Sequence, residues 1–341
     1  MRAKGQQSVM HVSGYRSGRV LWAAMVIALG AASVARGRES ARIELHVLET
    51  MTLSDEQFLT GSTEGTRVSI SAALRLPKAD VLPRTDADRQ PAMVLMHGSG
   101  GIQATEDRWA RELNDIGIAT LTVDSFTGRG ILYTAADQSQ LGNLATIVDA
   151  YRALELLAKN PFIDSKRIGV MGFSRGGRAA LYASLKRFQQ MHGPRGLEFA
   201  TYVPFYAACY AKYIDDEAVS DKPIRLFHGS VDDYTPVAPC RNYVERLRRA
   251  GKDVRLVEYP DAYHSFDNPL SQLRKSNSQT ARRCSLEEKA PGRVINVQDG
   301  MLFTWNHPCV ERGVMVGYNP RAHAESIKAV SNLLRTVFKL P

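Results

Sequence analysis

The segment Gly172-Phe-Ser174-Arg-Gly176 places one serine between two glycines, each separated from it by one residue. A serine hydroxyl becomes an effective nucleophile when a neighbouring base takes its proton and a tight turn holds it exposed at the tip. Such a turn leaves no room for side chains beside the serine, which glycine satisfies. The pattern is short, so Ser174 is either a nucleophile or a serine of an ordinary glycine-rich loop. The neighbouring segments must decide between the two.

The segments on either side of Ser174 favour the nucleophile. Residues 167–171 are typical of a strand, and residues 178–185 are a helix-forming run. A serine between a strand and a helix has the context that a nucleophile turn requires. The backbone N–H of Arg175 would then point into the site from the N-terminus of the helix, where negative charge is stabilised.

An acid and a histidine follow two later strands. The predicted strand 224–227 ends shortly before Asp232, and the predicted strand 254–259 ends shortly before His264. The reactive residues of an open α/β sheet gather at the carboxyl ends of its strands, so we expect both side chains to lie near Ser174. The chain order of serine, acid and histidine is also that of the α/β-hydrolase arrangement.

These residues need a sheet to position them, and the rest of the chain predicts one. Residues 66–76 alternate polar and apolar side chains, whereas the run 92–96 is continuously apolar and 118–123 is similar, as in strands buried on both faces. Apolar residues within 144–157 fall on one helical stripe. We therefore predict a single α/β domain over residues 36–341, with a mostly parallel central sheet and helices on both faces.

Four motifs together resemble a known family. They are His97-Gly-Ser-Gly-Gly101, Gly172-Phe-Ser-Arg-Gly-Gly177, Gly229-Ser-Val-Asp232 with Pro236, and Tyr259-Pro-Asp-Ala-Tyr-His264. The chain is similar to the α/β-hydrolase superfamily and, within it, to dienelactone hydrolase-like proteins, over roughly residues 66–266, and the segment at about 322–338 fits the closing helix of that fold. Dienelactone hydrolases carry cysteine as the nucleophile where this chain has Ser174. That departure argues against dienelactone as the substrate and fits a serine esterase.

The resemblance implies a Ser-His-Asp triad that transfers an acyl group to water. Ser174 would attack an ester carbonyl, His264 would serve as the general base, and Asp232 would orient and stabilise the imidazole. The family pattern favours Asp232 over its neighbour Asp233. Asp233 would instead cap the helix that begins near Pro236.

Other polar residues near these motifs are expected to support the site. The backbone amides of Ser99 and Arg175 would form the oxyanion hole. His97 and His228 also follow strands, and we interpret both as structural residues that hold loop backbones by hydrogen bonds. Arg129 could contact a substrate carboxylate, but we favour a solvated side chain or one that braces its own loop.

The predicted function is that of an exported serine hydrolase that cleaves esters of small soluble substrates. Only about fifteen residues, 208–222, lie where larger hydrolases insert a lid domain, so this segment is expected to be a loop. Two alternatives remain. One is a peptidase or amidase with the same triad, and the other is a non-catalytic binding protein on a hydrolase scaffold. The sequence carries no signal for the acyl part, the alcohol part or the oligomeric state.

The first 35 residues have the pattern of a signal peptide. A basic region ends at Arg19, the apolar run 20–35 follows, and it closes with small residues at Ser33 and Ala35. The run is short for a membrane span, and we expect no stable insertion into a membrane after its removal. We therefore predict a periplasmic or extracellular protein, and the alternative is tethering by an uncleaved N-terminal anchor.

An exported chain with an even number of cysteines is expected to form disulfides. The four cysteines allow three connectivities. We expect Cys209–Cys240, joining loops beside neighbouring strands, and Cys284–Cys309, closing a late insertion at about 268–320. That insertion begins beside His264, so it is expected to wall the site. The alternative is a surface excursion pinned by its disulfide.

The charge and metal-ligand patterns indicate what the chain does not bind. The net charge is +9, and four basic residues belong to the first 35. The remaining basic residues form no dense run, so we expect no nucleic-acid partner. The eight histidines are scattered and no cysteine has metal-site spacing, so we expect neither a metal nor another cofactor.

Overall fold

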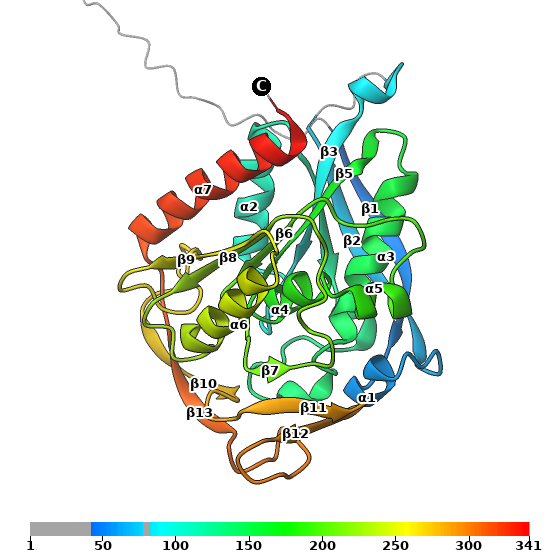
Figure 1. Cartoon of the computed structure of the whole chain (residues 1–341). Coiled ribbons are helices and arrows are strands. Elements are labelled where there is room, and N and C mark those ends of the chain that lie inside the picture. Colours follow the sequence, from blue (N-terminus) through cyan, green and yellow to red (C-terminus); the bar gives the residue numbers. More distant parts are fainter. Residues whose placement is uncertain (1–41, 78–81, 341) are drawn as a thin grey trace, which may run out of the picture. The chain divides into compact units, whose positions relative to one another are not determined.

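The computed structural model describes residues 42–77 and 82–340, so the expected signal peptide at 1–35 lies outside the described residues. Its centre is an eight-stranded sheet with the order β1-β2-β4-β3-β5-β6-β8-β9 (Figure 1). These strands are β1 (Arg42–Thr52), β2 (Thr66–Leu76), β3 (Gln90–Met96), β4 (Ala119–Asp124), β5 (Ile163–Phe173), β6 (Tyr202–Phe205), β8 (Ile224–Gly229) and β9 (Val254–Tyr259). The pairs β1–β2 and β2–β4 are antiparallel, and every later pair is parallel. The predicted mostly parallel sheet is confirmed.

Helices pack on both faces of this sheet, as predicted. They are α1 (Asp55–Leu59), α2 (Ala104–Asp115), α3 (Ala145–Lys159), α4 (Arg175–Tyr182), α5 (Lys186–His192), α6 (Val237–Arg249) and α7 (Pro320–Phe338). Helices α2 and α7 share one apolar core, whereas α3, α4, α5 and α6 share the other (Figure 1). All seven residues of β3 are buried because this strand lies between the two cores. Short 3-10 turns occur at Asp86–Asp88, Thr127–Arg129 and Gln138–Gln140.

Most predicted elements are present, with shifts at their ends. The strand expected at 66–76 has those bounds, and the stripe expected at 144–157 is α3. The helix expected at 178–185 begins earlier, at Arg175 directly after the serine turn. Helix propensity placed its start too late, because tight packing against the sheet makes Gly176 and Gly177 helical despite their poor intrinsic preference.

The late insertion forms two small sheets beside the carboxyl ends of the central strands. In the first, β10 (Arg274–Thr280) pairs antiparallel with β13 (Glu311–Val316). In the second, β11 (Leu286–Ala290) lies between β12 (Arg293–Asn296) and the short strand β7 (Ala211–Lys212). The second sheet therefore joins the insertion to the segment 208–222, which carries only this short strand and no helix (Figure 1).

Both expected disulfides are formed. Cys284–Cys309 closes the insertion, and Cys209–Cys240 joins the loop after β6 to helix α6. The expectation that Cys240 lies in a loop was wrong, because α6 has already begun at Val237. Within residues 42–77 and 82–340, no helix combines the length and apolar character needed to cross a membrane.

Candidate active site

Ser174 occupies a strained turn between β5 and α4. Its backbone has φ 55° and ψ −110°, a conformation that a residue with a side chain rarely adopts. The surroundings impose it, since the Ser174 N–H donates to the Phe205 carbonyl at 3.0 Å. A Cβ atom at Gly176 would lie 2.0 Å from the Met96 oxygen, and one at Gly172 would lie 2.1 Å from the Gly176 oxygen. Only glycine fits at these two positions, so the strained serine conformation is built into the sheet.

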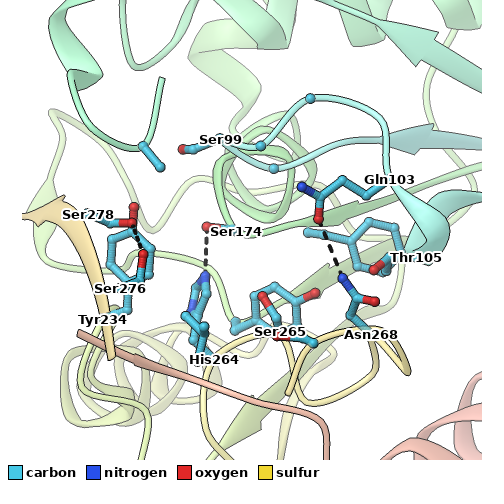
Figure 2. Close-up of a pocket in the computed structure, with 18 of the residues that line it drawn as sticks. Ser99, Gln103, Thr105, Ser174, Tyr234, His264, Ser265, Asn268, Ser276 and Ser278 are labelled. Atoms are coloured by element: carbon cyan, nitrogen blue, oxygen red, sulfur yellow. Dashed lines mark hydrogen bonds between the residues drawn. The ribbon is translucent and has the colours of Figure 1, made fainter. Parts of the chain in front are cut away.

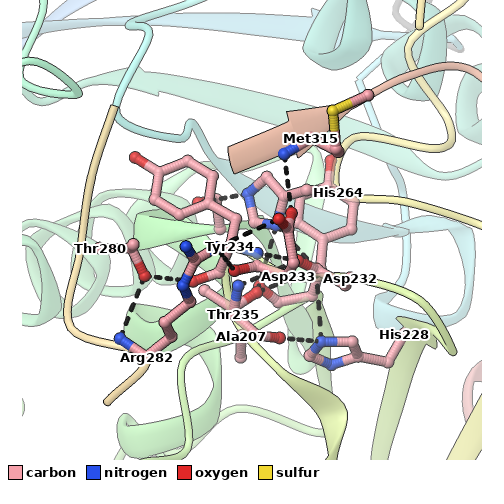
Figure 3. Close-up of polar contacts among 12 residues, drawn as sticks. Ala207, His228, Asp232, Asp233, Tyr234, Thr235, His264, Thr280, Arg282 and Met315 are labelled. Atoms are coloured by element: carbon pink, nitrogen blue, oxygen red, sulfur yellow. Dashed lines mark hydrogen bonds and ion pairs between the residues drawn. The ribbon is translucent and has the colours of Figure 1, made fainter. Parts of the chain in front are cut away.

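The structure brings Ser174, His264 and Asp232 into one hydrogen-bonded chain. His264 Nε2 lies 2.9 Å from Ser174 Oγ (Figure 2). On the other side of the ring, Nδ1 lies 2.8 Å from Asp232 Oδ2 (Figure 3). Asp232 follows β8 and His264 follows β9, so the carboxyl ends of parallel strands supply both partners. This arrangement allows Ser174 to lose its proton to a neighbouring base.

Asp232 is held as an ionised acceptor. Its Oδ1 accepts the backbone N–H groups of Tyr234 and Thr235, each at 2.9 Å, and its Oδ2 also accepts the Thr235 hydroxyl at 3.0 Å. Burial opposes ionisation, but the interactions with His264 and His228 outweigh it and hold the pKa of Asp232 well below its ordinary value. An ionised Asp232 makes Nδ1 the protonated nitrogen of His264 and leaves Nε2 as the acceptor for the serine proton.

Asp233 points away from His264 and binds the insertion. Its Oδ1 accepts the backbone N–H of Met315 at 2.7 Å, and its Oδ2 accepts from Arg282 at 3.1 Å (Figure 3). The expected helix cap was wrong, because α6 begins after Pro236 without a side-chain cap. The two adjacent carboxylates therefore serve different regions, since consecutive residues of the turn face opposite ways.

His97 and His228 hold loop backbones, as expected from the sequence. His97 accepts the Ser125 N–H at Nε2 at 3.0 Å, and its Nδ1 lies 2.7 Å from the Gly98 carbonyl. Burial lowers the pKa of His97, which keeps the ring neutral for these two roles. His228 Nε2 lies 2.6 Å from the Thr235 carbonyl and 3.4 Å from Asp232 Oδ2.

Ser99 lies on the loop after β3, and Arg175 is the first residue of α4. The Arg175 N–H belongs to the first helical turn and has no partner within the helix. The loop after β3 approaches the serine turn closely, since a Cβ at Gly98 would lie 3.2 Å from the Phe173 carbonyl. Ser99 and Ser174 line the same cavity. Both residues therefore lie beside Ser174.

Gln138 is a residue of the site that sequence reasoning missed. Its side-chain oxygen accepts from the Ser99 hydroxyl at 3.1 Å and from the Arg175 guanidinium at 2.7 Å, while its Nε2 donates to the Tyr234 hydroxyl at 3.1 Å. From the insertion, Gln279 accepts the Gln138 backbone N–H at 2.8 Å. No local pattern marks Gln138, because every one of these partners is distant in sequence. The side-chain amide of Gln138 thus braces both Ser99 and Arg175.

Two tyrosines enclose the His264 ring. The rings of Tyr206 and Tyr234 each lie 4.6 Å from it, measured between centroids. The Tyr206 hydroxyl donates to Asp267 at 2.8 Å, and Trp109 Nε1 donates to the other oxygen of Asp267 at 2.7 Å. The imidazole is therefore fixed by packing as well as by its two hydrogen bonds.

A cavity of about 360 Å³ opens in front of Ser174 and His264 (Figure 2). One wall comes from the loop after β3 and the start of α2, including Gln103. The facing wall comes from the insertion, including Asn268 and residues of β10. The insertion therefore walls the site, as expected, and the Cys284–Cys309 disulfide crosslinks it internally.

Arg129 lies in the fold interior and does not line this cavity. It makes two hydrogen bonds of 2.9 Å to the Asp149 carboxylate and further bonds to Thr52 and the carbonyls of Met51 and Ser125. It braces its loop against β1 and α3. Among residues 42–77 and 82–340, no cluster of three or more His, Cys, Asp or Glu side chains is placed to hold a metal ion.

The sequence profile of the dienelactone hydrolase family matches residues 79–338. The chain belongs to the dienelactone hydrolase family. This family assignment agrees with the fold, the serine turn and the order of the three site residues along the chain.

Curated relatives of this family member are distant. A protein named dipeptidyl peptidase family member 1 from Caenorhabditis elegans is 25% identical over 280 residues, covering 74% of this chain and 33% of that protein. A "Putative carboxymethylenebutenolidase" from Methylorubrum extorquens is 27% identical over 190 residues, covering 52% of this chain and 63% of that protein. The chain thus spans about a third of the first relative and less than two thirds of the second.

Solved structures share the fold. A dienelactone hydrolase-like promiscuous phosphotriesterase from metagenomic libraries aligns with a TM-score of 0.52 at 18% identity, over 86% of this chain and 98% of that chain. Esterase 2 from Thermogutta terrifontis, phosphonylated by cyclosarin, aligns with a TM-score of 0.50 at 17% identity, over 68% and 88% of the two chains. At such identities the likeness concerns the fold alone.

Proposed function

We propose that this dienelactone hydrolase family member is a serine esterase for small soluble esters, with Ser174 as nucleophile, His264 as general base and Asp232 as the orienting acid. The observation that carries the proposal is the continuous chain of hydrogen bonds, 2.9 Å from Ser174 to His264 and 2.8 Å from His264 to Asp232. A binding protein on the same scaffold has no need of this geometry.

The reaction follows from the positions of the protons. His264 Nε2 takes the Ser174 proton as the serine oxygen bonds to the ester carbonyl carbon, and the carbonyl oxygen becomes an oxyanion. The imidazolium then gives that proton to the departing alkoxide as the ester C–O bond breaks, which leaves an acyl-enzyme and a free alcohol. Water, deprotonated by His264, attacks the acyl-enzyme next and releases the acid with Ser174 restored.

The amides of Ser99 and Arg175 are proposed to bind the oxyanion. Fixed N–H donors aimed at developing charge in a water-poor site are usually a large part of catalysis, at about 3 kcal/mol for each donor lost. The Arg175 amide has the further advantage of the helix N-terminus behind it. Gln138 would act through these residues by keeping their backbone in position.

A peptidase with the same triad is the second candidate, because several relatives carry peptidase names. The match to dipeptidyl peptidase family member 1 from Caenorhabditis elegans covers only 33% of that protein. Most of that relative therefore has no counterpart in this match. Membership of the dienelactone hydrolase family favours esters over peptides as substrates.

We also propose export by the N-terminal signal, and the two disulfides agree with an oxidising compartment.

The test is hydrolysis of p-nitrophenyl acetate to octanoate and of dipeptidyl p-nitroanilides by the chain from residue 36. Ser174→Ala should lower the rate on esters by several orders of magnitude, and the wild-type protein should become labelled at Ser174 by an organophosphate. Equal rates for the variant and the wild type would remove the serine mechanism. Faster cleavage of the anilides than of every ester would instead establish the peptidase.

A further inference from the structure

The cavity beside the proposed triad carries many neutral hydrogen-bonding groups among apolar side chains such as Phe173, Leu270 and Val316. Its lining includes the amides of two residues and the hydroxyls of several more. They are Gln103, Thr105, Asn268, Ser271, Ser276 and Ser278. Most of these come from the insertion, and they face the start of α2 across the cavity (Figure 2). A cavity of about 360 Å³ falls within the size range of small-molecule sites.

Few charges face this space, so its chemistry is polar but close to neutral. Arg274 is exposed at the rim. Glu106 is only 2% exposed, its Oε2 accepts the Gln103 N–H at 2.7 Å, and burial raises its pKa to about 8. At neutral pH this carboxyl is therefore protonated and already engaged. Neither a cationic amine nor a strongly anionic group finds a buried charged partner here.

The neutral groups are arranged to bind a ligand with several hydroxyls. Ser276 and Ser278 stand on the same face of β10, with their oxygens 2.8 Å apart, and together present two adjacent donor–acceptor groups. Asn268 and Gln103 are joined across the cavity by a long bond of 3.4 Å, which a ligand hydroxyl can replace (Figure 2). At the edge, Tyr133 is 45% exposed, and its ring offers an apolar surface to C–H groups.

We infer that the alcohol released from the ester is polyhydroxylated and of monosaccharide size, so that the enzyme acts on esters of sugars. This inference rests on the proposed function, because His264 must return its proton to the leaving oxygen and His264 lines this cavity. An alkyl alcohol of the same shape would displace water from the amide and hydroxyl groups of the wall and offer them no hydrogen bonds in return. Sites built to hydrogen-bond a substrate discriminate strongly against analogues that lack the bonding groups.

The experiment compares two acetates of primary alcohols on six-membered rings. Methyl 6-O-acetyl-α-D-glucopyranoside carries the hydroxyls, and cyclohexylmethyl acetate has none. We expect kcat/KM to be at least about tenfold higher for the sugar ester, mainly through a lower KM. Equal values, or a preference for the cyclohexyl ester, overturn the inference. Cleavage of p-nitrophenyl acetate with neither of these acetates hydrolysed also overturns it while the proposed esterase stands, and no cleavage of any ester sinks both.

A pair of matched variants assigns the preference to the insertion. Ser276→Ala with Ser278→Ala should lower the ratio of the two kcat/KM values by about fivefold, because two hydrogen-bonding groups are lost from the wall. The control is Ser69→Ala with Ser71→Ala, an exposed serine pair with the same two-residue spacing on strand β2, outside the cavity. An unchanged ratio in the first variant, with a circular-dichroism spectrum and a thermal melting temperature like those of the wild type as a check on folding, contradicts the assignment.

Discussion

The strand-end loops and the insertion face each other across one cavity, but they are held in different ways. The loops carry Ser174, Asp232 and His264 and are fixed by the central sheet, as the strained backbone of Ser174 shows. The insertion forms its own small sheets, and Asp233 ties it to the loop after β8 through Met315 and Arg282. The difference separates a rigid part suited to chemistry from an added part suited to substrate choice.

The largest effect is expected at Asp232, which belongs to the strand-end loops. Its neighbour Asp233, which binds the insertion, serves as the comparison. Asp232→Asn should lower kcat on p-nitrophenyl acetate by about 10⁴-fold, because an amide that donates to His264 favours the wrong tautomer. Asp233→Asn should change kcat by less than about tenfold, because that side chain only binds the insertion. Comparable losses in the two variants would contradict the division between the regions.

Gln138 joins the two regions, and its removal should produce the next largest effect. Gln138→Ala should lower kcat about 10- to 100-fold with little change in KM, because Ser99 and Arg175 lose a shared acceptor while both proposed oxyanion amides remain. Gln138→Glu keeps that acceptor and should restore part of kcat. A raised KM with unchanged kcat would show that Gln138 serves substrate binding instead.

Removing each disulfide in turn should affect activity less than the changes at Asp232 and Gln138, and should distinguish the insertion from the main core. Loss of Cys284–Cys309 through serine substitutions should raise KM severalfold and leave kcat within about threefold, because it loosens the wall of the cavity but not the triad. The matched control removes Cys209–Cys240, which anchors α6 in the main core.

Removal of the control disulfide should lower the free energy of unfolding of the whole domain, by about 4 kcal/mol for a sequence separation of 31 residues. Urea unfolding and steady-state kinetics on both variants provide the measurement. A large fall in kcat for the insertion variant would mean that the triad depends on the insertion for its geometry.

Glu106, on the α2 side of the cavity, should mainly affect how the stability of the protein depends on pH. Its pKa is raised from 4.5 to about 8 by burial, so the folded protein keeps a proton that the unfolded chain has lost. The free energy of unfolding should therefore fall as pH rises from about 4.5 to about 8, by at most about 1.4 kcal/mol per unit from this group. Glu106→Gln should flatten that decline and raise stability near pH 8, as measured by urea unfolding from pH 5 to 9. An identical pH dependence in the variant would show that Glu106 is ionised in the folded protein.

Sequence reasoning succeeded where the signal was local. Strand β2 has the predicted bounds, and the strand–serine–helix order around Ser174 follows from side-chain periodicity and two glycines. It failed where a partner lies far along the chain. Neither the bracing role of Gln138 nor the attachment of Asp233 to Met315 has a local pattern, because each depends on loops that meet only after folding.

The sequence by itself therefore determined the family, the α/β architecture and the residue types of the proposed triad, because these are written in short-range spacing and in the order of elements. The tertiary structure decided which of two adjacent aspartates reaches His264, which amide braces the loop at Ser99, and that the insertion walls the cavity. These depend on the direction of single side chains and on the packing of distant loops, where a shift of about 1 Å decides whether a hydrogen bond forms.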